Sequence, residues 1–317
     1  MSYLLTGSFA YDEILMHDGH FHSRILPEAV NNLNVYFGIK DYKKEFGGCA
    51  GNISYNAALL KDDVTLCASV GNDFHSYEAH LNKCGISSET ITKHEDTITA
   101  HFWIMTDESN NQITSGKSGA MNLIPKLPSN TSELNLWHIA PMSTGVIAYM
   151  VKEAVTRNVD YFLDPGQALP SLLEGDAEGI YPFKKMLENA KGIFVNEYES
   201  KLLQDKFKKQ LDGFLNSKTT FIVETLGSKG LNIHTHDGKI FVPVAKPAKI
   251  ADPTGCGDAL RAGFLYAYSR GLSLQKCAEL GSIMGSFAIE SSGGQNHKPT
   301  KEEISQRLRY TYDWTIK

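Results

Sequence analysis

Apolar and polar positions alternate along most of the chain in a way that separates short buried strands from amphipathic helices. Apolar runs of about 4–8 residues are typical of buried strands, and apolar positions that recur every three or four residues are typical of helices. Strands that alternate with helices indicate a parallel sheet covered on both faces. The sequence therefore predicts an α/β fold with a mainly parallel central sheet covered by helices. The expected strands are 3–9, 64–70, 161–164, 192–195, 220–225, 231–236 and 239–244, and the expected helices are 52–61, 145–157 and one that begins at Glu197.

Two stretches, 18–46 and 98–118, interrupt this alternation. In the second, "ITAHFWIM" and "NQITSGK" flank the turn residues 107–111, which is the pattern of a β-hairpin. We interpret both stretches as strands of a small lid, formed by about 13–46 and 98–118, on a single domain that spans 1–317. The chain from Asp258 onward is predicted to be mainly helical.

Composition narrows the class of partner. A chain of 317 residues that is 42% hydrophobic can bury a full core. Its net charge of −5 provides no general attraction for nucleic acid or an anionic membrane. The chain lacks a run of about 20 apolar residues, and no basic segment precedes the first strand, so neither a membrane span nor a secretion signal is expected. A small-molecule partner is the remaining expectation.

The cysteines indicate the compartment. They are odd in number, widely spaced and free of CxxC pairs, so neither a disulfide framework nor a zinc site is expected. We therefore expect a soluble protein in the reducing cytoplasm. The five cysteines are Cys49, Cys67, Cys84, Cys256 and Cys277.

The strongest chemical motif is "ADPTGCGDALRAGF", residues 251–264. It places Gly255, Cys256 and Gly257 directly before a helical pattern that begins at Asp258. The start of a helix offers unpaired N–H groups, and small residues there let a phosphoryl group approach the backbone, which makes an anion hole. Asp258 at the same edge can accept the proton of a hydroxyl that attacks phosphorus in line. The alternative is a favourable first-turn acid behind a tight glycine turn.

The string "DPTGCGDALRAGF" resembles the C-terminal signature of the ribokinase and phosphofructokinase-B superfamily. The Asp-Pro-Thr-Gly-x-Gly-Asp form followed by Arg-Ala-Gly is most similar to bacterial adenosine and nucleoside kinases. This resemblance implies a three-layer ribokinase-like domain, ATP as phosphate donor and Asp258 as the catalytic base. It also implies that Asp252 and Thr254 help to hold a monovalent cation such as K⁺.

The N-terminal part carries the expected substrate residues. "FGGCAGN" is similar to the glycine-pair motif of the superfamily, which implies that Gly48 and Asn52 contact the sugar. "GSFAYD" adds Ser8 and Asp12 at the end of the first strand. A carboxylate there can accept hydrogen bonds from two vicinal hydroxyls, so Asp12 is the main substrate candidate, with a turn aspartate as the alternative. Gln167 completes this group.

Two further strings are expected to contact the nucleotide. In the superfamily, the Asn-x-x-Glu of "VNEYES" positions the Mg²⁺ shell through water, which implies this role for Asn196 and Glu199. The same spacing also fits a helix N-cap followed by an exposed acid. "TLGSKG" resembles the ATP loop, and the resemblance places Thr225, Gly227 and Gly230 near the phosphates and ribose.

"AIESSGGQNH" resembles the closing segment that flanks the adenine and the cation in the superfamily. The resemblance makes the carbonyl groups of Ala288, Ser291 and Gly293 candidate ligands of the same monovalent cation.

The acceptor is indicated by the lid. "ILPEAVNNLNVYFGIKDYKKEFGGCAGN" is more similar to bacterial adenosine kinases than to sugar kinases, and Cys49 stands where ribokinase-like proteins carry a lysine. Aromatic faces in the lid can stack on a purine base, although core or lid packing is the alternative for each. Gly116 and Lys117 stand where nucleoside kinases of this type carry a further aromatic residue, which argues against strict adenosine specificity. The aromatic residues concerned are Tyr36, Phe37, Phe102 and Trp103.

The resulting hypothesis is an ATP-dependent kinase that phosphorylates the 5′-hydroxyl of a nucleoside, with adenosine, and hence purine salvage, preferred. A broad-specificity nucleoside kinase, a ribose- or fructose-type sugar kinase and an inactive regulatory relative stay open. Asp258 and its glycines argue against the inactive relative, and the lack of GxGxxG in "TGSFAYDEI" argues against a dinucleotide oxidoreductase. Exposed lid edges favour a homodimer.

Overall fold

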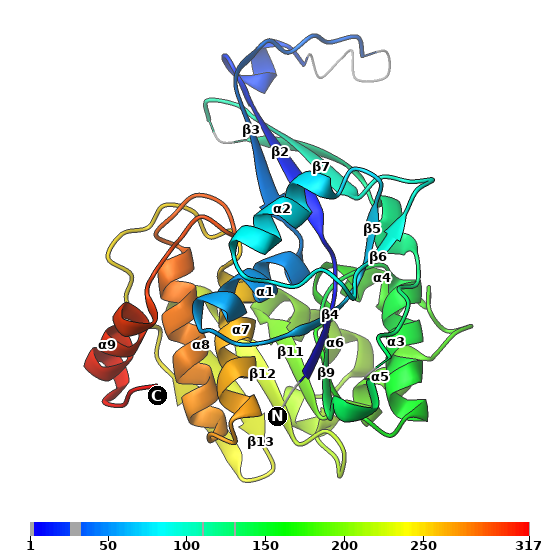
Figure 1. Ribbon diagram of the computed structural model, residues 1–317, viewed down its shortest axis with the longest axis vertical. Helices are drawn as coiled ribbons and strands as arrows, with labels where there is room; N and C mark the ends of the chain where they lie inside the picture. Colours follow the sequence, from blue (N-terminus) through cyan, green and yellow to red (C-terminus); the bar gives the residue numbers. More distant parts are fainter. Residues whose placement is uncertain (1–2, 26–32, 110, 130, 317) are drawn as a thin grey trace.

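The computed structural model describes residues 3–25, 33–109, 111–129 and 131–316, and its centre is an eight-stranded sheet (Figure 1). The strand order is β14-β13-β12-β11-β10-β9-β1-β4. Strands β1, β4 and β9 to β12 are parallel, and β13 and β14 form an antiparallel hairpin at one edge. The predicted α/β class is thus confirmed. The bounds are β1 Tyr3–Thr6, β4 Thr65–Cys67, β9 Leu136–Ile139, β10 Asp160–Leu163, β11 Gly192–Asn196, β12 Phe221–Thr225, β13 Leu231–Thr235 and β14 Gly238–Val242.

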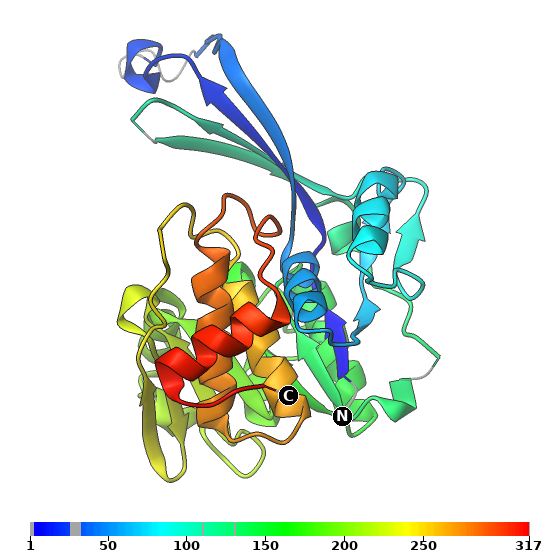
Figure 2. The same ribbon diagram turned by 60° about the vertical axis from the view of Figure 1, so that its left-hand side comes forward.

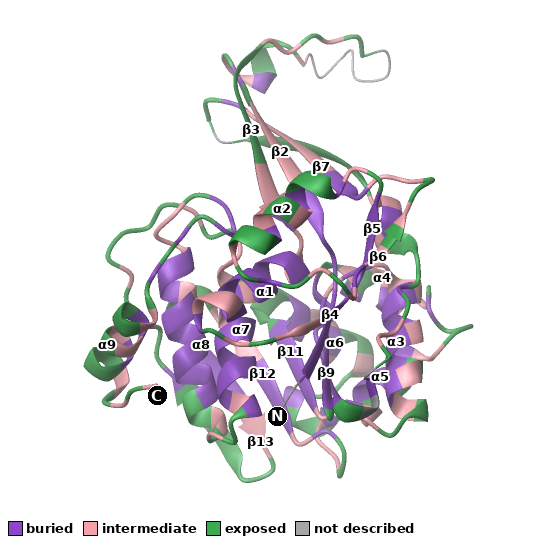
Figure 3. Ribbon diagram, in the orientation of Figure 1, coloured by how far each residue is buried: buried purple, intermediate pink, exposed green. Residues whose placement is uncertain are grey.

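Helices cover both faces of this sheet, because successive strand residues point to opposite sides. On β11, for example, Phe194 belongs to one buried cluster with α7 and α8, whereas Ile193 and Val195 belong to another with α3 and α5. Figure 3 shows both helical layers turning buried residues toward the sheet. The helices are α1 Cys49–Leu59, α2 His75–Lys83, α3 Thr144–Thr156, α4 Leu169–Glu174, α5 Phe183–Asn189, α6 Glu197–Phe207, α7 Cys256–Ser269, α8 Leu274–Ala288 and α9 Lys301–Tyr312.

A second sheet, here called the projecting sheet, rises from the core (Figures 1 and 2). Its order is β3-β2-β7-β8, with β2 and β7 parallel and the outer pairs antiparallel. The expected hairpin at 98–118 is β7 and β8, and residues 26–32 of the other stretch lie outside the described residues. The bounds are β2 Ala10–His17, β3 Ile39–Gly47, β7 Ala100–Thr106 and β8 Gln112–Lys117, with a separate parallel pair of β5 Ser69–Gly71 and β6 Thr92–His94.

Several boundaries differ from the sequence expectation. Helix α1 begins at Cys49 rather than Asn52, because Gly48, at φ 84°, turns the chain directly into the helix. Helix α7 begins at Cys256, so Asp258 lies inside its first turn. The expected strand 64–70 is divided, because β4 continues the central sheet while β5 pairs with β6. Strand β9 was not predicted, since His138 interrupts its short apolar run.

Among the described residues no helix is long and apolar enough to cross a bilayer. Short 3₁₀ turns connect the helices and strands. The 3₁₀ turns are Phe21–Ser23, Gly119–Asn122, Thr131–Glu133, Gly166–Ala168, Leu211–Phe214 and Gly227–Lys229.

Candidate active site

The predicted anion hole is the N-terminus of α7. Its N-cap, Gly255, has φ 77°, and a Cβ there would lie 2.8 Å from the Cα of Gly294. Glycine is therefore required both by the left-handed backbone and by the close approach of a second loop. The first-turn N–H groups of α7 have no intrahelical partners, and the positive end of the helix dipole adds to their attraction for an anion.

Asp258 is held beside this helix start. The Nδ2 of Asn52 donates to its Oδ2 at 2.8 Å, across 206 residues of sequence. Burial raises the pKa of Asp258 to about 6, although the hydrogen bond from Asn52 and the charge of Arg261 oppose this. A carboxylate with a pKa near neutrality is suited to accept a proton from a hydroxyl group. The structure thus brings together the predicted base and the predicted sugar-binding Asn52.

An ion pair that the sequence analysis missed lies next to the anion hole. Arg261 Nε donates to Asp164 Oδ2 at 2.8 Å, and its Nη1 donates to the carbonyl oxygen of Gly257 at 3.3 Å. Both side chains are buried. The sequence does show that Arg261 lies three residues after Asp258, a spacing at which helical residues share a face, but it does not pair Arg261 with Asp164. Arg261 therefore joins the first turn of α7 to the end of β10.

The glycine pair brings the start of α1 against the end of β1. A Cβ on Gly48 would lie 2.6 Å from the Ser8 carbonyl oxygen, and a Cβ on Gly47 would collide with the Asp12 carboxylate. The Oγ of Ser8 accepts from the N–H of Cys49 at 3.1 Å, so Ser8 helps to start the helix.

Asp12 is not at the end of the first strand, where the sequence analysis placed it. Strand β1 ends at Thr6, and Asp12 is the third residue of β2 in the projecting sheet. Burial, and then the charge of Glu45 on β3, raise the pKa of Asp12 to about 6. The residue is therefore carried by the element interpreted as a lid.

Asn196 and Glu199 form a reciprocal cap at the start of α6. The Asn196 Oδ1 accepts from the Glu199 N–H at 2.9 Å, and the Glu199 Oε2 accepts from the Asn196 N–H at 2.8 Å. The N-cap interpretation is thus correct, but the exposed acid that it assumed is not, because Glu199 is only 7% exposed. Its pKa is raised by burial and by the charge of Asp164. A role for this pair toward Mg²⁺ stays a prediction.

The two predicted nucleotide strings lie on neighbouring strands. Thr225 ends β12, where Asn196 of β11 is its register partner. The loop that follows is closed by a hydrogen bond from the Leu226 N–H to the Gly230 carbonyl oxygen, 2.8 Å. Gly227 and Gly230 have φ 57° and 109°, values that favour glycine. The backbone conformation of this loop is therefore sufficient to require glycine at both positions, with or without a contact to ATP.

The two strings expected to hold a monovalent cation also meet. Asp252 accepts from the N–H groups of Thr254 and Gly293, both at 2.9 Å. Burial alone would raise the pKa of Asp252, but these hydrogen bonds outweigh it and lower the pKa. The Ala288 carbonyl oxygen accepts from the Ser291 N–H at 3.3 Å. Among the described residues no group of three or more His, Cys, Asp or Glu could hold a metal ion, so a cation here would depend on carbonyl oxygens beside the single carboxylate of Asp252.

The lid aromatics separate into different environments. Phe102 is the register partner of Asp12, so the two share one face of the projecting sheet. Trp103 points to the opposite face, where its Nε1 donates to Glu13 Oε2 at 3.2 Å. Phe37 packs on Phe21 with a centroid distance of 5.3 Å. Of these aromatic residues, Phe102 is therefore the one that shares a sheet face with Asp12.

Two of the expected substrate residues are exposed to solvent. Tyr36 is 84% exposed, and Gln167 is exposed in the turn that follows β10.

Gly116 lies under Phe102, since a Cβ there would be 2.7 Å from the Phe102 ring. The glycine that stands in place of a further aromatic residue thus accommodates the Phe102 ring.

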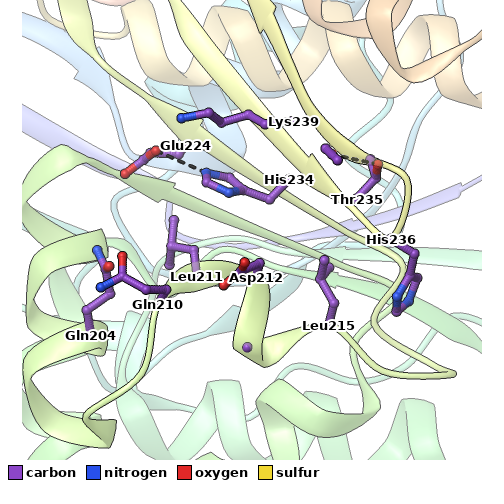
Figure 4. Close-up of a pocket in the computed structure, with 12 residues that line it drawn as sticks. Gln204, Gln210, Leu211, Asp212, Leu215, Glu224, His234, Thr235, His236 and Lys239 are labelled. Carbon is purple, nitrogen blue, oxygen red and sulfur yellow. Dashed lines mark hydrogen bonds and ion pairs between the residues drawn. The ribbon is translucent and has the colours of Figure 1, made fainter.

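A separate cavity of about 770 Å³ lies on the sheet beside α6, and none of the predicted site residues lines it (Figure 4). Glu224 accepts there from Ser200, Asn232 and His234, and the bond from His234 is the main reason that its pKa is lowered to about 2. The Glu224 carboxylate, which lines this cavity, is thus already paired within the protein.

Comparisons with known proteins identify the family. Residues 34–301 match the pfkB family carbohydrate kinases. The chain is 33% identical over 277 residues to a nucleoside kinase of Methanocaldococcus jannaschii, covering 87% of this chain and 89% of that protein. It is 24% identical to an ATP-dependent ribose-1-phosphate kinase of Halopiger xanaduensis, covering 91% and 93%.

The structure is also similar to the nucleoside kinase of Burkholderia thailandensis solved in complex with inosine. The TM-score is 0.81 and the identity 31%, with 99% of each chain covered. The chain therefore belongs to the pfkB family of carbohydrate kinases, as the C-terminal signature predicted, and is a kinase that acts on a hydroxyl group.

Proposed function

We propose that this kinase transfers the γ-phosphoryl group of ATP to the 5′-hydroxyl of a nucleoside, with adenosine as the expected acceptor and purine salvage as its role. The observation that carries the proposal is the contact of Asp258 with Asn52 at the anion hole of α7. It joins the base to the helix that also begins at the glycine pair. Support for a nucleoside comes from the relatives named as nucleoside kinases.

In this proposal, Asp258 accepts the proton of the 5′-hydroxyl while the oxygen forms a bond to the γ-phosphorus. The bond from that phosphorus to the β,γ-bridging oxygen breaks, and ADP leaves with the electron pair. The N–H groups at Gly255 to Gly257 stabilise the charge on the transferred group. Mg²⁺ near Asn196 and Glu199 would screen the phosphates, and K⁺ near Asp252 and Gly293 would do so indirectly.

The acceptor is tested by ADP release from Mg-ATP with adenosine, inosine, guanosine, cytidine, ribose and fructose. The expected result is the highest kcat/KM for adenosine, followed by the other purine nucleosides. The Asp258→Asn variant, purified in parallel, controls for contaminating kinases. A higher kcat/KM for ribose or fructose would replace the proposal by the sugar-kinase alternative, which the similarity to a ribose-1-phosphate kinase keeps open.

The pH dependence of turnover follows from the state of Asp258. Its ionised form is the active one, so kcat/KM should fall as the pH decreases through about 6, the value to which burial raises its pKa. Asp12 has a raised pKa of about 6 as well. The dependence of kcat/KM on pH is therefore measured in parallel on Asp12→Asn. The decrease of kcat/KM on the acid side, here called the acid limb, should persist in this variant. An acid limb that disappears in Asp12→Asn would assign it to Asp12 instead.

We propose that the projecting sheet acts as a lid, because Asp12 and Phe102 share the face on which a ligand of Asp12 would lie. Acceptor binding should slow amide hydrogen exchange in 18–46 and 98–118. Exchange is measured with and without saturating nucleoside, with the β13–β14 hairpin as internal reference. Unchanged exchange at saturation would return Phe102 to a packing role.

We also propose a homodimer formed through the projecting sheet. β3 and β8 are its edge strands, and Ile39, Tyr42 and Ile113 on them are 40%, 52% and 41% exposed. Exposed strand edges with apolar side chains favour pairing with a second copy. Sedimentation should give a dimer for the wild type and a monomer for Ile113→Lys, and a monomeric wild type would disprove the proposal.

A further inference from the structure

Gln295 is a buried amide that the reaction as described above does not use. It lies between α8 and α9, and its side chain is only 3% exposed. Its Nε2 donates to Asn52 Oδ1 at 3.0 Å and to the Tyr77 hydroxyl at 2.6 Å, while its Oε1 meets His80 Nε2 at 2.9 Å. Every polar atom of this side chain is thus engaged by α1 or α2.

The direction of these bonds is set by chemistry. An ionised carboxylate only accepts hydrogen bonds, so Asn52 must turn its NH₂ toward Asp258. The carbonyl oxygen of Asn52 then faces Gln295 and requires a donor. If Asn52 turned over, its oxygen would face the carboxylate and its NH₂ would face the NH₂ of Gln295. Gln295 therefore opposes the wrong orientation of Asn52.

Gln295 cannot turn over either, because its Oε1 would then face the Oδ1 of Asn52, and neither oxygen can donate. In the orientation that remains, Oε1 faces His80, so the Nε2 of His80 must carry a hydrogen. Burial lowers the pKa of His80, but this nitrogen remains a donor whether the ring is neutral in that tautomer or protonated. The Tyr77 hydroxyl accepts from Gln295 and donates to the Gly47 carbonyl oxygen at 2.8 Å. The bonds therefore run in one direction, from His80 through Gln295 and Asn52 to Asp258.

We propose that Gln295 is a positioning residue, whose amide holds Asn52 in the orientation that donates to the catalytic base. The proposal rests on the proposed role of Asp258. Without this donor the ionised base is less stabilised, so its pKa rises and less of it is active near neutral pH. Tyr77 connects the same network to the glycine pair that begins α1.

The other charged and titratable groups around this network stay in place in the variants proposed below. Around Asp258 they are Cys49 on α1, Tyr77 on α2, Asp164 after β10, and Cys256 and Arg261 on α7, and around Tyr77 and His80 they are Tyr11, Asp12, Lys83, Cys84 and Lys298.

Gln295→Met keeps the length of the side chain and removes its hydrogen bonds, whereas Gln295→Glu keeps the shape and replaces the donor by an acceptor. Both should move the acid limb upward by about one pH unit, so kcat/KM should fall only about two-fold at pH 7 but roughly 10-fold at pH 5. Asn232→Leu is the matched control. Asn232 on β13 is also a buried amide, and it donates to Glu224 on β12 at 3.0 Å. Asn232→Leu should lower thermal stability and leave the acid limb unchanged.

The decisive comparison is made in the Asn52→Ala background. If Gln295 acts through Asn52, adding Gln295→Met there should lower kcat/KM no further. A multiplicative loss, or a wild-type acid limb in folded Gln295→Glu, would overturn the proposal. If Gln295→Met does not fold, Gln295→Glu carries the same test. Full activity of Asp258→Asn would instead show that Asp258 is not the base. Failure of the proposed function is thus distinguishable from failure of the Gln295 proposal.

Discussion

Asp258→Asn is expected to lower kcat by about two to four orders of magnitude, while nucleoside binding stays close to wild type. Asparagine keeps the shape of the side chain but cannot accept the hydroxyl proton. The side chain lies in the first turn of α7 and receives a hydrogen bond from Asn52, and the Oδ1 of asparagine can still accept that bond. The structural disturbance should thus be small.

The measurement is steady-state kcat with Mg-ATP, combined with calorimetric binding of the nucleoside. Arg270→Lys, a conservative change at the C-cap of α7, where Arg270 forms an ion pair with Asp62, is the control and should retain wild-type kcat. Turnover of Asp258→Asn within a factor of a few of wild type would exclude Asp258 from proton transfer.

The same variant should be more stable than the wild type above pH 6. The folded-state pKa of Asp258 is about 6, above the ordinary value of 3.8, so between about pH 4 and 6 the folded state binds more protons than the unfolded state. The free energy of unfolding therefore decreases as the pH rises through this range. A neutral asparagine avoids this loss, so its Tm should exceed that of the wild type at pH 8 but not at pH 4.

Asp12→Ala is expected to raise the KM for every accepted nucleoside by roughly 10- to 100-fold, the scale of a lost hydrogen bond between a charged group and a hydroxyl. Asp12 is half-buried, with its carboxylate against Gly47. The carboxylate would therefore be left without partners whenever the hydroxyls are missing. By the same reasoning, 2′-deoxy- and 3′-deoxyadenosine should be poor acceptors for the wild type.

The control for this prediction is Glu13→Gln, the neighbouring acid, which points to the opposite face of the projecting sheet and contacts Trp103. The KM of Glu13→Gln should stay near that of the wild type. Equal kcat/KM for ribo- and deoxynucleosides would contradict the assignment of Asp12 to the sugar.

Local sequence signals explain why the fold class and the family could be predicted from the sequence. The anion hole is encoded within residues 251–264, since Gly255 needs φ 77° and Asp258 lies in the first turn of the following helix. The hairpin of β7 and β8 is likewise encoded by alternation and turn residues over 98–118. The reciprocal cap of Asn196 and Glu199 depends on a spacing of three residues. Each signal needs only neighbouring residues.

Contacts between distant residues could not be derived in the same way. Arg261 meets Asp164 across 97 residues, and Gln295 meets Asn52 across 243. No local periodicity records such pairs, because they depend on how α1, α7 and the segment before α9 pack over the sheet. Gln295 stood in the string "GGQNH", but its sequence neighbours gave no reason to single it out.

The sequence by itself determined the alternating α/β architecture, the helix start that can bind a phosphoryl group, and Asp258 as the candidate base, because glycine conformation and helix geometry are local properties. Only the tertiary structure decided that Asp12 is carried by β2 of the projecting sheet, that Phe102 rather than Trp103 shares its face, and that Asn52 donates to Asp258. Strand register and the burial that raises the pKa of Asp258 arise only when distant segments pack together.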